Sequence, residues 1–214
     1  MEVFNLLTSI TDKDAKRIKA FIKQIDKGPF KYLNDKKCSS PQSEYIVSAN
    51  NKKYKNIYQC AVAQAWLDVC RRVEVNEYTK SKIEAGKKII VDGLQKYFEG
   101  KPKNEEAFEG WYNSLLSIST KNTALKVGQA QKIINMAFKY LFCCEDIREN
   151  KMSHFTWCHI PLDKVTLDWL GMKGLAWTSI DDLELYSMII EFARSKTNNG
   201  NLLLKDFEVW KPMK

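Results

Sequence analysis

Two segments of the sequence carry residue types that can do nucleophilic chemistry. Residues 121–144 read KNTALKVGQAQKIINMAFKYLFCC and contain Lys132. Residues 158–171 read CHIPLDKVTLDWLG and contain Asp163. A lysine amine that has lost its proton can attack an electrophilic carbon, and an ionised carboxylate can stabilise positive charge that develops in a reaction. Lys132 and Asp163 are therefore the first candidate catalytic residues.

Lys132 lies in an amphipathic pattern that has two interpretations. Apolar residues from Ile133 to Leu141 define a buried side of the expected helix, and Lys132, Asn135 and Lys139 form a polar stripe on the other face. In the first interpretation this stripe is an ordinary solvated lysine face. In the second, Lys132 lies near a partly buried helix start, where desolvation and neighbouring cations leave an amine neutral enough to attack.

Asp163 follows Pro161 and stands where a short helix is expected to begin. Its side chain can accept hydrogen bonds from backbone N–H groups of the first helical turn, close to the positive end of the helix dipole. Most aspartates at such positions are only caps. The second interpretation is that the carboxylate is held ionised there for a reaction.

The order and spacing of these segments resemble the helix-hairpin-helix DNA glycosylases. The features are a lysine on a helix that follows a hairpin and, about thirty residues later, an apolar-Pro-apolar-Asp run that opens another helix. The runs 131–139 and 160–163 are most similar to the archaeal 8-oxoguanine glycosylase branch, which also has an Asp and a Trp four positions apart near its carboxyl end. Asp206 and Trp210 stand in that order here.

The resemblance implies a mechanism and a set of roles. The target nucleotide would be rotated out of the DNA stack, Lys132 would attack the sugar, and Asp163 would stabilise the positive charge that develops as the base leaves. Asp206 would hydrogen-bond the extruded base and Trp210 would stack on it. The hairpin and its helix would hold the DNA through Lys126, Gly128, Gln129 and Lys139. The hairpin departs from the usual pattern, because only one glycine, Gly128, is present.

Gln64 and Trp66, which precede these segments in the sequence, each have two possible roles. Gln64 is a polar residue in a largely apolar stretch and reads either as a structural hydrogen-bonding group or as a group that contacts a base edge. Trp66 reads either as a core residue or as a base-stacking residue.

The length of the chain and the arrangement of its segments favour one class of substrate. The chain resembles the prokaryotic antiviral glycosylases that excise glucosylated hydroxymethylcytosine from phage DNA, and the long polar loop expected at residues 28–53 could provide a roomy pocket for such a base. The first alternative is an 8-oxoguanine or oxidised-base repair glycosylase with strand-cleaving lyase activity. The second is a non-catalytic helical nucleic-acid-binding protein, and a protein-interaction module with a basic face is a third.

These candidate residues require helices to position them, and helical periodicity covers most of the chain. Thr11 with Asp14, and Ser179 with Asp182, have the spacing of capping boxes. Sustained alternation of period two is absent, so the sequence predicts an all-α, glycosylase-like helical fold with the active-site pocket between helical layers. The expected helices cover residues 11–25, 55–73, 76–98 with a break at Gly86 or Gly93, 104–118, 125–144, 161–170, 179–196 and 202–210.

Composition and charge set the class of protein and partner. The 214 residues are 44% hydrophobic and 28% charged, which excludes a disordered chain, and the apolar runs are too short for a membrane span. The net charge of +8 favours a polyanionic partner. We therefore expect a single domain over residues 1–214, with 1–100 and 101–214 as alternative subdomains. It would be a cytoplasmic monomer that binds double-stranded DNA containing a modified base, without a cofactor.

Cysteine and histidine spacing predicts no metal site. The six cysteines form no C-x-x-C pair and are expected to be reduced in a cytosolic chain. His154 and His159, even with the adjacent Cys143 and Cys144, do not have the spacing of structural zinc ligands.

Overall fold

The computed structural model describes residues 9–25, 45–47, 52–54, 56–100, 104–121, 123–197 and 200–210. Apart from one two-stranded ribbon, the regular structure of these residues is helical, as the sequence predicts. The elements are α1 (Asp12–Ile25), β1 (Tyr45–Val47), β2 (Lys52–Tyr54), α2 (Ile57–Val69), η3 (Cys70–Arg72), α3 (Glu77–Glu99), α4 (Glu105–Thr120), α5 (Val127–Cys143), α6 (Glu145–Lys151), η4 (Met152–Phe155), α7 (Lys164–Leu170), η5 (Trp177–Ser179), α8 (Leu183–Ser195) and α9 (Leu202–Val209).

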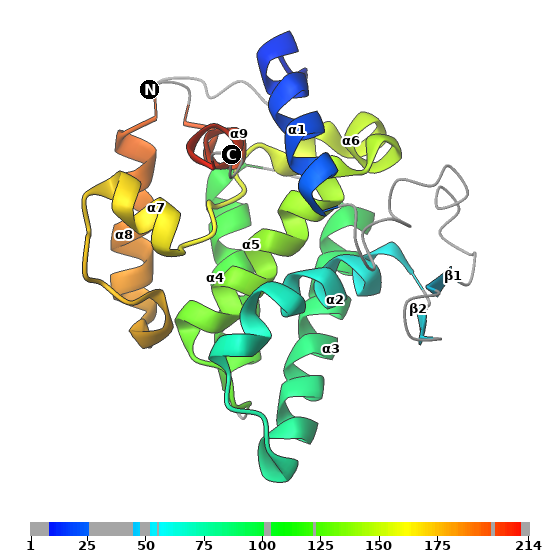
Figure 1. Cartoon of the computed structure of the whole chain (residues 1–214), viewed down its shortest axis with the longest axis vertical. Coiled ribbons are helices and arrows are strands. Elements are labelled where there is room, and N and C mark those ends of the chain that lie inside the picture. The colour runs from blue at the N-terminus through cyan, green and yellow to red at the C-terminus, as the bar shows by residue number, and fades with distance from the viewer. Residues whose placement is uncertain are drawn as a thin grey trace.

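Helix α5 runs through the centre of the molecule (Figure 1). It packs against α2, α4, α6, α8 and η5, and buried side chains from α1 to α9 join in one hydrophobic cluster around it. Every residue of α5 except Lys132 is buried. Helix α5 therefore has no solvated face, and Lys132 marks the one point at which it approaches the surface.

The predicted polar stripe on the solvent side of this helix is wrong for two of its three members. Asn135 and Lys139 are almost completely buried. The sequence pattern marks them as polar, but neighbouring helices cover that side of α5 as well, and these two side chains find partners inside the protein. A polar residue on a helix is exposed only if nothing packs over it.

Short polar side chains begin most of the described helices. Thr11 and Asp14 form the predicted reciprocal capping bonds. Ser179 does not cap α8, because it lies in η5 and its hydroxyl donates to the Ala176 carbonyl. Asp182 is the cap of α8. The other helices with a side-chain cap begin after Asn56, Asn76, Asn104, Asp163 and Asn201.

Other differences from the expected elements have packing causes. Helix α3 continues through Gly86 and Gly93, so the expected break is wrong. Gly93 instead allows close packing of α4, because a Cβ there would lie 2.5 Å from a Leu115 methyl group. Helix α6 and η4 were not expected. Strands β1 and β2 pair antiparallel within the segment expected to be a loop, with Ile46 opposite Lys53. Most of that 28–53 segment lies outside the described residues.

Gly128 fixes the start of α5 against η5. Its N–H donates to the Ile180 carbonyl at 2.8 Å, and a Cβ at this position would lie 1.8 Å from the Trp177 carbonyl oxygen. The close approach of two backbones thus explains the glycine. It also places Trp177 beside the first turns of α5, where Lys132 is located.

We expect Gly128→Ala to destabilise the fold by about 1–3 kcal/mol, because the backbone of η5 would have to move. Gly110→Ala is the matched control, since a Cβ at Gly110 in α4 meets nothing within 4 Å. That variant should gain about 0.5–1 kcal/mol from its higher helix propensity. Urea unfolding of both variants measures the difference, and equal stability would contradict the packing role of Gly128.

Candidate active site

The structure brings Lys132 and Asp163 together. The Lys132 Nζ lies 3.4 Å from Asp163 Oδ2, although the two residues are 31 positions apart. Their side chains are 12% and 26% exposed, so both are reachable from solvent but largely surrounded by protein. The two candidate catalytic residues of the sequence are therefore in contact, as the family resemblance implies.

Asp163 is a helix cap and an ion-pair partner at once. Its Oδ1 accepts hydrogen bonds from the N–H groups of Val165 and Thr166, at 2.9 and 3.1 Å. The other oxygen faces Lys132. The prediction that Asp163 is a helix cap is therefore confirmed. The cap also orients the carboxylate, because the two backbone donors occupy Oδ1 and leave Oδ2 for the amine.

Gln131, beside Lys132 in sequence, holds the segment that carries Asp163. Its Nε2 donates to the carbonyls of Leu162 and Gly128 at 2.9 and 2.8 Å, and its Oε1 accepts the Leu162 N–H at 3.1 Å. A side-chain amide thus pairs with both backbone groups of Leu162, the residue before Asp163. The sequence interpretation missed this residue; its signal was a glutamine in a helix that is apolar on nearly every side.

The hydrogen bonds between Gln131 and Leu162 are part of a larger buried polar network. Asn135 donates to Gln131 Oε1, the Ile160 carbonyl and the Tyr186 hydroxyl, and it accepts from the Tyr112 hydroxyl. Each of these groups would be costly to bury without a partner. The network therefore fixes residues 160–163 on α5 in one position.

His159 ends this network and links it to a surface ion pair. Its ring nitrogens lie 2.8 Å from the Tyr186 hydroxyl and 2.8 Å from Glu109 Oε1, and Arg194 contacts the same Glu109 oxygen at 2.7 Å. Burial lowers the pKa of His159, and the Glu109 carboxylate only partly opposes this effect. His159 thus has partners that explain its position without a metal, and no group of metal-ligating side chains occurs among the described residues.

A pocket of about 440 Å³ opens over the Lys132 and Asp163 pair. This volume is in the range of small-molecule sites, roughly 300–1,000 Å³. The indole ring of Trp177 covers one side, with its centroid 4.6 Å from Lys132 Nζ. Charged side chains dominate the rest of the lining, which consists of Asp68, Arg71, Arg72, Lys132, Asp163, Lys164, Val165 and Trp177.

Asp68 is a second carboxyl group of this pocket, and the sequence interpretation missed it. It follows Gln64 by one turn on α2, and its Oδ2 accepts a hydrogen bond from the Tyr140 hydroxyl at 2.6 Å. Burial raises the pKa of Asp68, against the opposing effects of Tyr140, Lys132 and Lys139. No sequence spacing links Asp68 to Lys132, because α2 and α5 meet only in the folded chain.

Lys139 and Asp206 form a separate, buried ion pair. Lys139 Nζ lies 2.7 Å from Asp206 Oδ2, and their side chains are only 2% and 9% exposed. The amine lies 4.1 Å from the ring centroid of Phe21, 4.8 Å from that of Phe207 and 5.5 Å from that of Trp210. Burial raises the pKa of Asp206, and the charge of Lys139 opposes that rise.

The roles given to Lys139, Asp206 and Trp210 by the family resemblance therefore do not match their surroundings. Lys139 is covered and cannot reach a DNA phosphate in this conformation, and Asp206 is occupied by Lys139. Trp210 packs edge to face on Phe21 of α1, with ring centroids 5.0 Å apart. Neither Asp206 nor Trp210 belongs to the described lining of the pocket.

Gln64 and Trp66 also lie in packed positions on α2. Gln64 is buried and hydrogen-bonds the Tyr140 hydroxyl, which supports its structural interpretation. Its Oε1 has no partner among the described residues. Trp66 packs against the hydrophobic cluster, and the Lys87 amine lies 5.4 Å from its ring centroid.

The backbone amides of Lys126, Val127 and Gly128, at the start of α5, have partners within the protein. The Lys126 N–H donates to Gln129 Oε1 at 2.9 Å, while Gln129 Nε2 donates to the Arg72 carbonyl at 3.0 Å. Gln129 thus ties the hairpin to the end of η3 and contributes its side chain to the fold. The side chain of Lys126 is exposed and remains available for contact with a nucleic acid.

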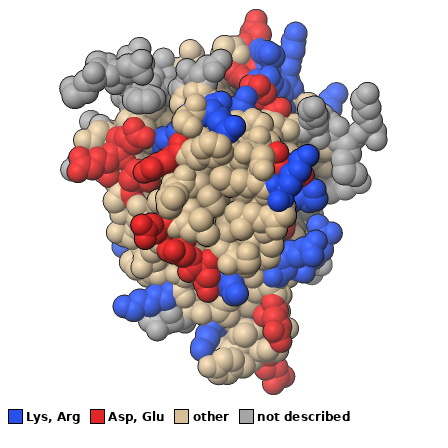
Figure 2. Space-filling model, turned by 90° about the vertical axis from the view of Figure 1, so that its left-hand side faces the viewer, with Lys and Arg blue, Asp and Glu red and all other residues tan. Residues whose placement is uncertain are grey.

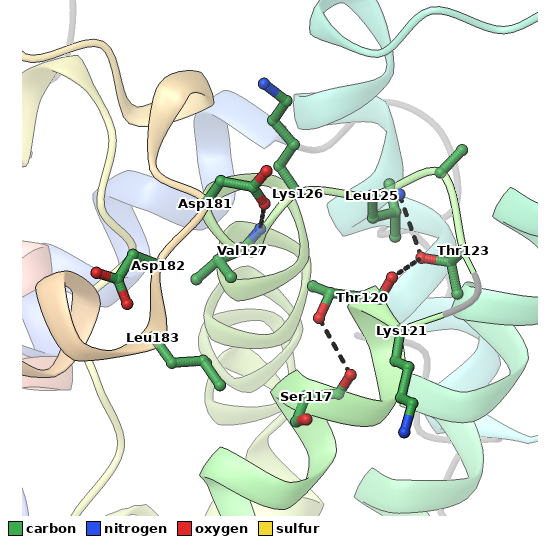
Figure 3. Close-up of a pocket in the computed structure, with 11 residues that line it drawn as sticks. Ser117, Thr120, Lys121, Thr123, Leu125, Lys126, Val127, Asp181, Asp182 and Leu183 are labelled. Atoms are coloured by element: carbon green, nitrogen blue, oxygen red, sulfur yellow. Dashed lines mark hydrogen bonds between the residues drawn. The ribbon is translucent and has the colours of Figure 1, made fainter.

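Figure 3 shows a second pocket, of about 720 Å³, beside this hairpin. Asp181 points at the start of α5, and its Oδ1 lies 3.5 Å from the Val127 nitrogen. The next amide, that of Gly128, is taken by Ile180. Lys121 and Lys126 extend away from each other on opposite sides of the hairpin (Figure 3). A phosphate at this place would have to displace the Asp181 carboxylate.

The charge of the surface is not uniform. Figure 2 shows the side of the molecule at the left of Figure 1, where Asp and Glu gather on the face and Lys and Arg lie mostly toward its edges. The excess of 34 Lys and Arg over 26 Asp and Glu therefore does not make this face a basic one. Arg71, Arg72 and Lys164 instead bring positive charge to the Lys132 pocket.

Comparisons with protein-family models, with curated proteins and with solved structures each gave no match. No helix among the described residues is both long enough and apolar enough to cross a membrane. The described cysteines, Cys60, Cys70, Cys143, Cys144 and Cys158, are thiols. The geometry of the pocket is therefore the basis for any functional argument.

The buried ion pair has a testable effect on stability. We expect Asp206→Asn to lower the free energy of unfolding by about 3–5 kcal/mol, because Lys139 would remain as a buried charge without its counterion. Adding Lys139→Met to this variant should recover much of the loss. Urea unfolding of both variants tests this, with Asp92→Asn on the exposed surface of α3 as the control; an unchanged midpoint in Asp206→Asn would contradict the pairing.

The raised pKa of Asp68 predicts a pH-dependent difference in stability. A carboxyl group whose pKa rises on folding stabilises the protein below its ordinary pKa of 3.8, and this contribution is lost as the pH rises through the higher folded value. We therefore expect Asp68→Asn to be more stable than the parent protein at neutral pH. The gap should close on acidification below about pH 4. Unfolding curves at several pH values measure it, and a less stable variant at pH 7 would show that burial is not the dominant effect.

Proposed function

We propose that the chain is a DNA glycosylase that excises a modified base from DNA, with Lys132 as nucleophile and Asp163 as its electrostatic partner. The observation that carries this proposal is the 3.4 Å contact between an amine and a carboxylate inside a pocket of about 440 Å³. The contact also fits the glycosylase resemblance of the sequence, which joins the same two residues.

The chemistry follows from the surroundings of the amine. Once Lys132 has lost its proton, Nζ attacks C1′ of the flipped nucleotide, and the bond from C1′ to the base breaks as the base leaves with the electron pair. Asp163, held by the first turn of α7, lies beside the sugar and stabilises its positive charge. The open-chain Schiff base that follows can be reduced by borohydride to a stable adduct.

The remaining side chains of the pocket suit a nucleotide. The Trp177 indole offers a flat surface for a base or sugar, and Arg71, Arg72 and Lys164 offer positive charge for the phosphates beside it. The predominance of charged groups in the lining also favours a base that carries polar substituents. Within this proposal the first choice of substrate is therefore glucosylated hydroxymethylcytosine of phage DNA in antiviral defence. The alternative is an oxidised base such as 8-oxoguanine.

A second candidate function is non-catalytic binding of nucleic acid by the same basic side chains. Because Arg71, Arg72 and Lys164 gather at one opening, the protein could bind nucleic acid with Lys132 as a phosphate contact only. This candidate predicts steeply salt-dependent binding and no released base from any DNA.

The test is base release from duplexes that contain glucosylated hydroxymethylcytosine, 8-oxoguanine or no modification, followed by liquid chromatography. We expect release from one modified duplex and a covalent adduct after borohydride. Lys132→Ala should lower both by at least ~100-fold. The control is Lys88→Ala on the exposed surface of α3. If Lys132→Ala keeps full release, its role as nucleophile is wrong; binding without release by the parent protein supports the second candidate.

A further inference from the structure

The pocket holds two carboxyl groups near one amine, and their environments differ. Asp163 contacts Lys132 and has Oδ1 occupied by two backbone donors. Asp68 enters the same pocket from α2, and its Oδ2 accepts a hydrogen bond from the Tyr140 hydroxyl. When two carboxyl groups have such different surroundings, they can take different roles in one reaction.

The nucleophile needs a proton acceptor. An ammonium group has no electron pair for attack, so the reaction proposed above begins only when Lys132 transfers a proton to a base. Asp163 has a different task in that reaction, because its Oδ1 is occupied by two backbone N–H groups and its other oxygen is directed at the charge of the amine and the sugar. A carboxyl group in a less polar environment binds a proton more readily.

We propose that Asp68 is this proton acceptor: its carboxylate takes the proton of Lys132 and returns it to the departing base. The proposal rests on the glycosylase function proposed above. The atoms balance, because the bond from Nζ to C1′ forms, the bond from C1′ to the base breaks, and the base leaves with that electron pair and with the proton carried by Asp68. No further reactant is needed.

The contacts of Asp68 support this role. The Tyr140 hydroxyl donates to it from α5, and the charges of Lys132 and Lys139 act on it from the same helix. The charge of Asp163, which lines the same pocket from the turn before α7, acts in the opposite sense. Arg71 and Arg72 line the same opening from η3, and Lys164 lines it from α7. Burial raises the pKa of Asp68 despite this positive surrounding, so the group changes its protonation closer to neutral pH than an exposed aspartate does.

The protonation equilibrium of Asp68 can be shifted through the Tyr140 hydroxyl, without removing the carboxyl group. It donates to Asp68 Oδ2 at 2.6 Å and so stabilises the ionised form. Tyr140→Phe removes this donor and leaves the ring in place, which should raise the pKa of Asp68 further. The pH dependence of the reaction should then move to higher pH.

The experiment uses a DNA duplex with a single abasic site, because its aldehyde reacts with Lys132 whatever base the enzyme excises. The full chain is incubated with this probe and cyanoborohydride from pH 5 to 9, and the covalent adduct is measured on a denaturing gel. The variants are Asp68→Asn, Tyr140→Phe and Lys132→Ala, with Asp92→Asn of the α3 surface as the matched control. Urea unfolding establishes that each variant is folded.

We expect the rate of adduct formation by the parent protein to rise with pH and to depend on Lys132. Asp68→Asn should form the adduct at least ~100-fold more slowly and lose the rise with pH, at unchanged affinity for the duplex. Tyr140→Phe should keep the maximal rate and shift the rise to higher pH. A merely structural role for Asp68 would not produce this pair of profiles.

Two other results separate the failures. If the parent protein forms a Lys132-dependent adduct and folded Asp68→Asn keeps its rate and pH profile, the role of Asp68 is refuted and the glycosylase proposal survives. If no Lys132-dependent adduct forms with the parent protein, both proposals are refuted.

Discussion

The pairing of the Gln131 side chain with the backbone of Leu162 is the constraint on which the rest of the site depends. One amide takes both hydrogen-bonding groups of the residue before Asp163, in a region that is closed to water. Because an unpaired buried amide or carbonyl is costly, the segment 160–163 has little freedom to settle elsewhere on α5. The contact between Lys132 and Asp163 follows from this placement, because Lys132 directly follows Gln131 and Asp163 directly follows Leu162.

Helix α5 tolerates unusual polarity for a central helix. It buries Gln131, Asn135 and Lys139 along with its apolar residues, and each has partners from other elements. Such networks rigidify a structure only when they are fully satisfied. Around Lys132 this rigidity has a chemical consequence, because the amine, the Asp163 carboxylate and the Trp177 ring are held in fixed relation before any ligand binds.

The helices were predictable because their signals are local. Caps such as Asn76 and Asn104, and the apolar periodicity of α3 and α8, depend on residues within one or two turns of each other. The same local logic failed for Ser179, where the chain enters a short η5 turn before α8 begins at the next cap. It also failed for Lys139, because no local pattern reports that α1 and α9 bring Phe21, Phe207 and Asp206 over it.

By itself the sequence determined the helical class, most helix positions and the candidate pair Lys132 and Asp163, because residue type and spacing along one chain carry that information. Only the tertiary structure decided what surrounds the pair. It placed Asp68 of α2 in the pocket and buried Lys139 with Asp206. It also gave the amides of Lys126 and Gly128 hydrogen-bond partners inside the protein. The physical reason is that burial and electrostatic environment depend on contacts between segments distant in sequence, and these contacts exist only after the helices have packed.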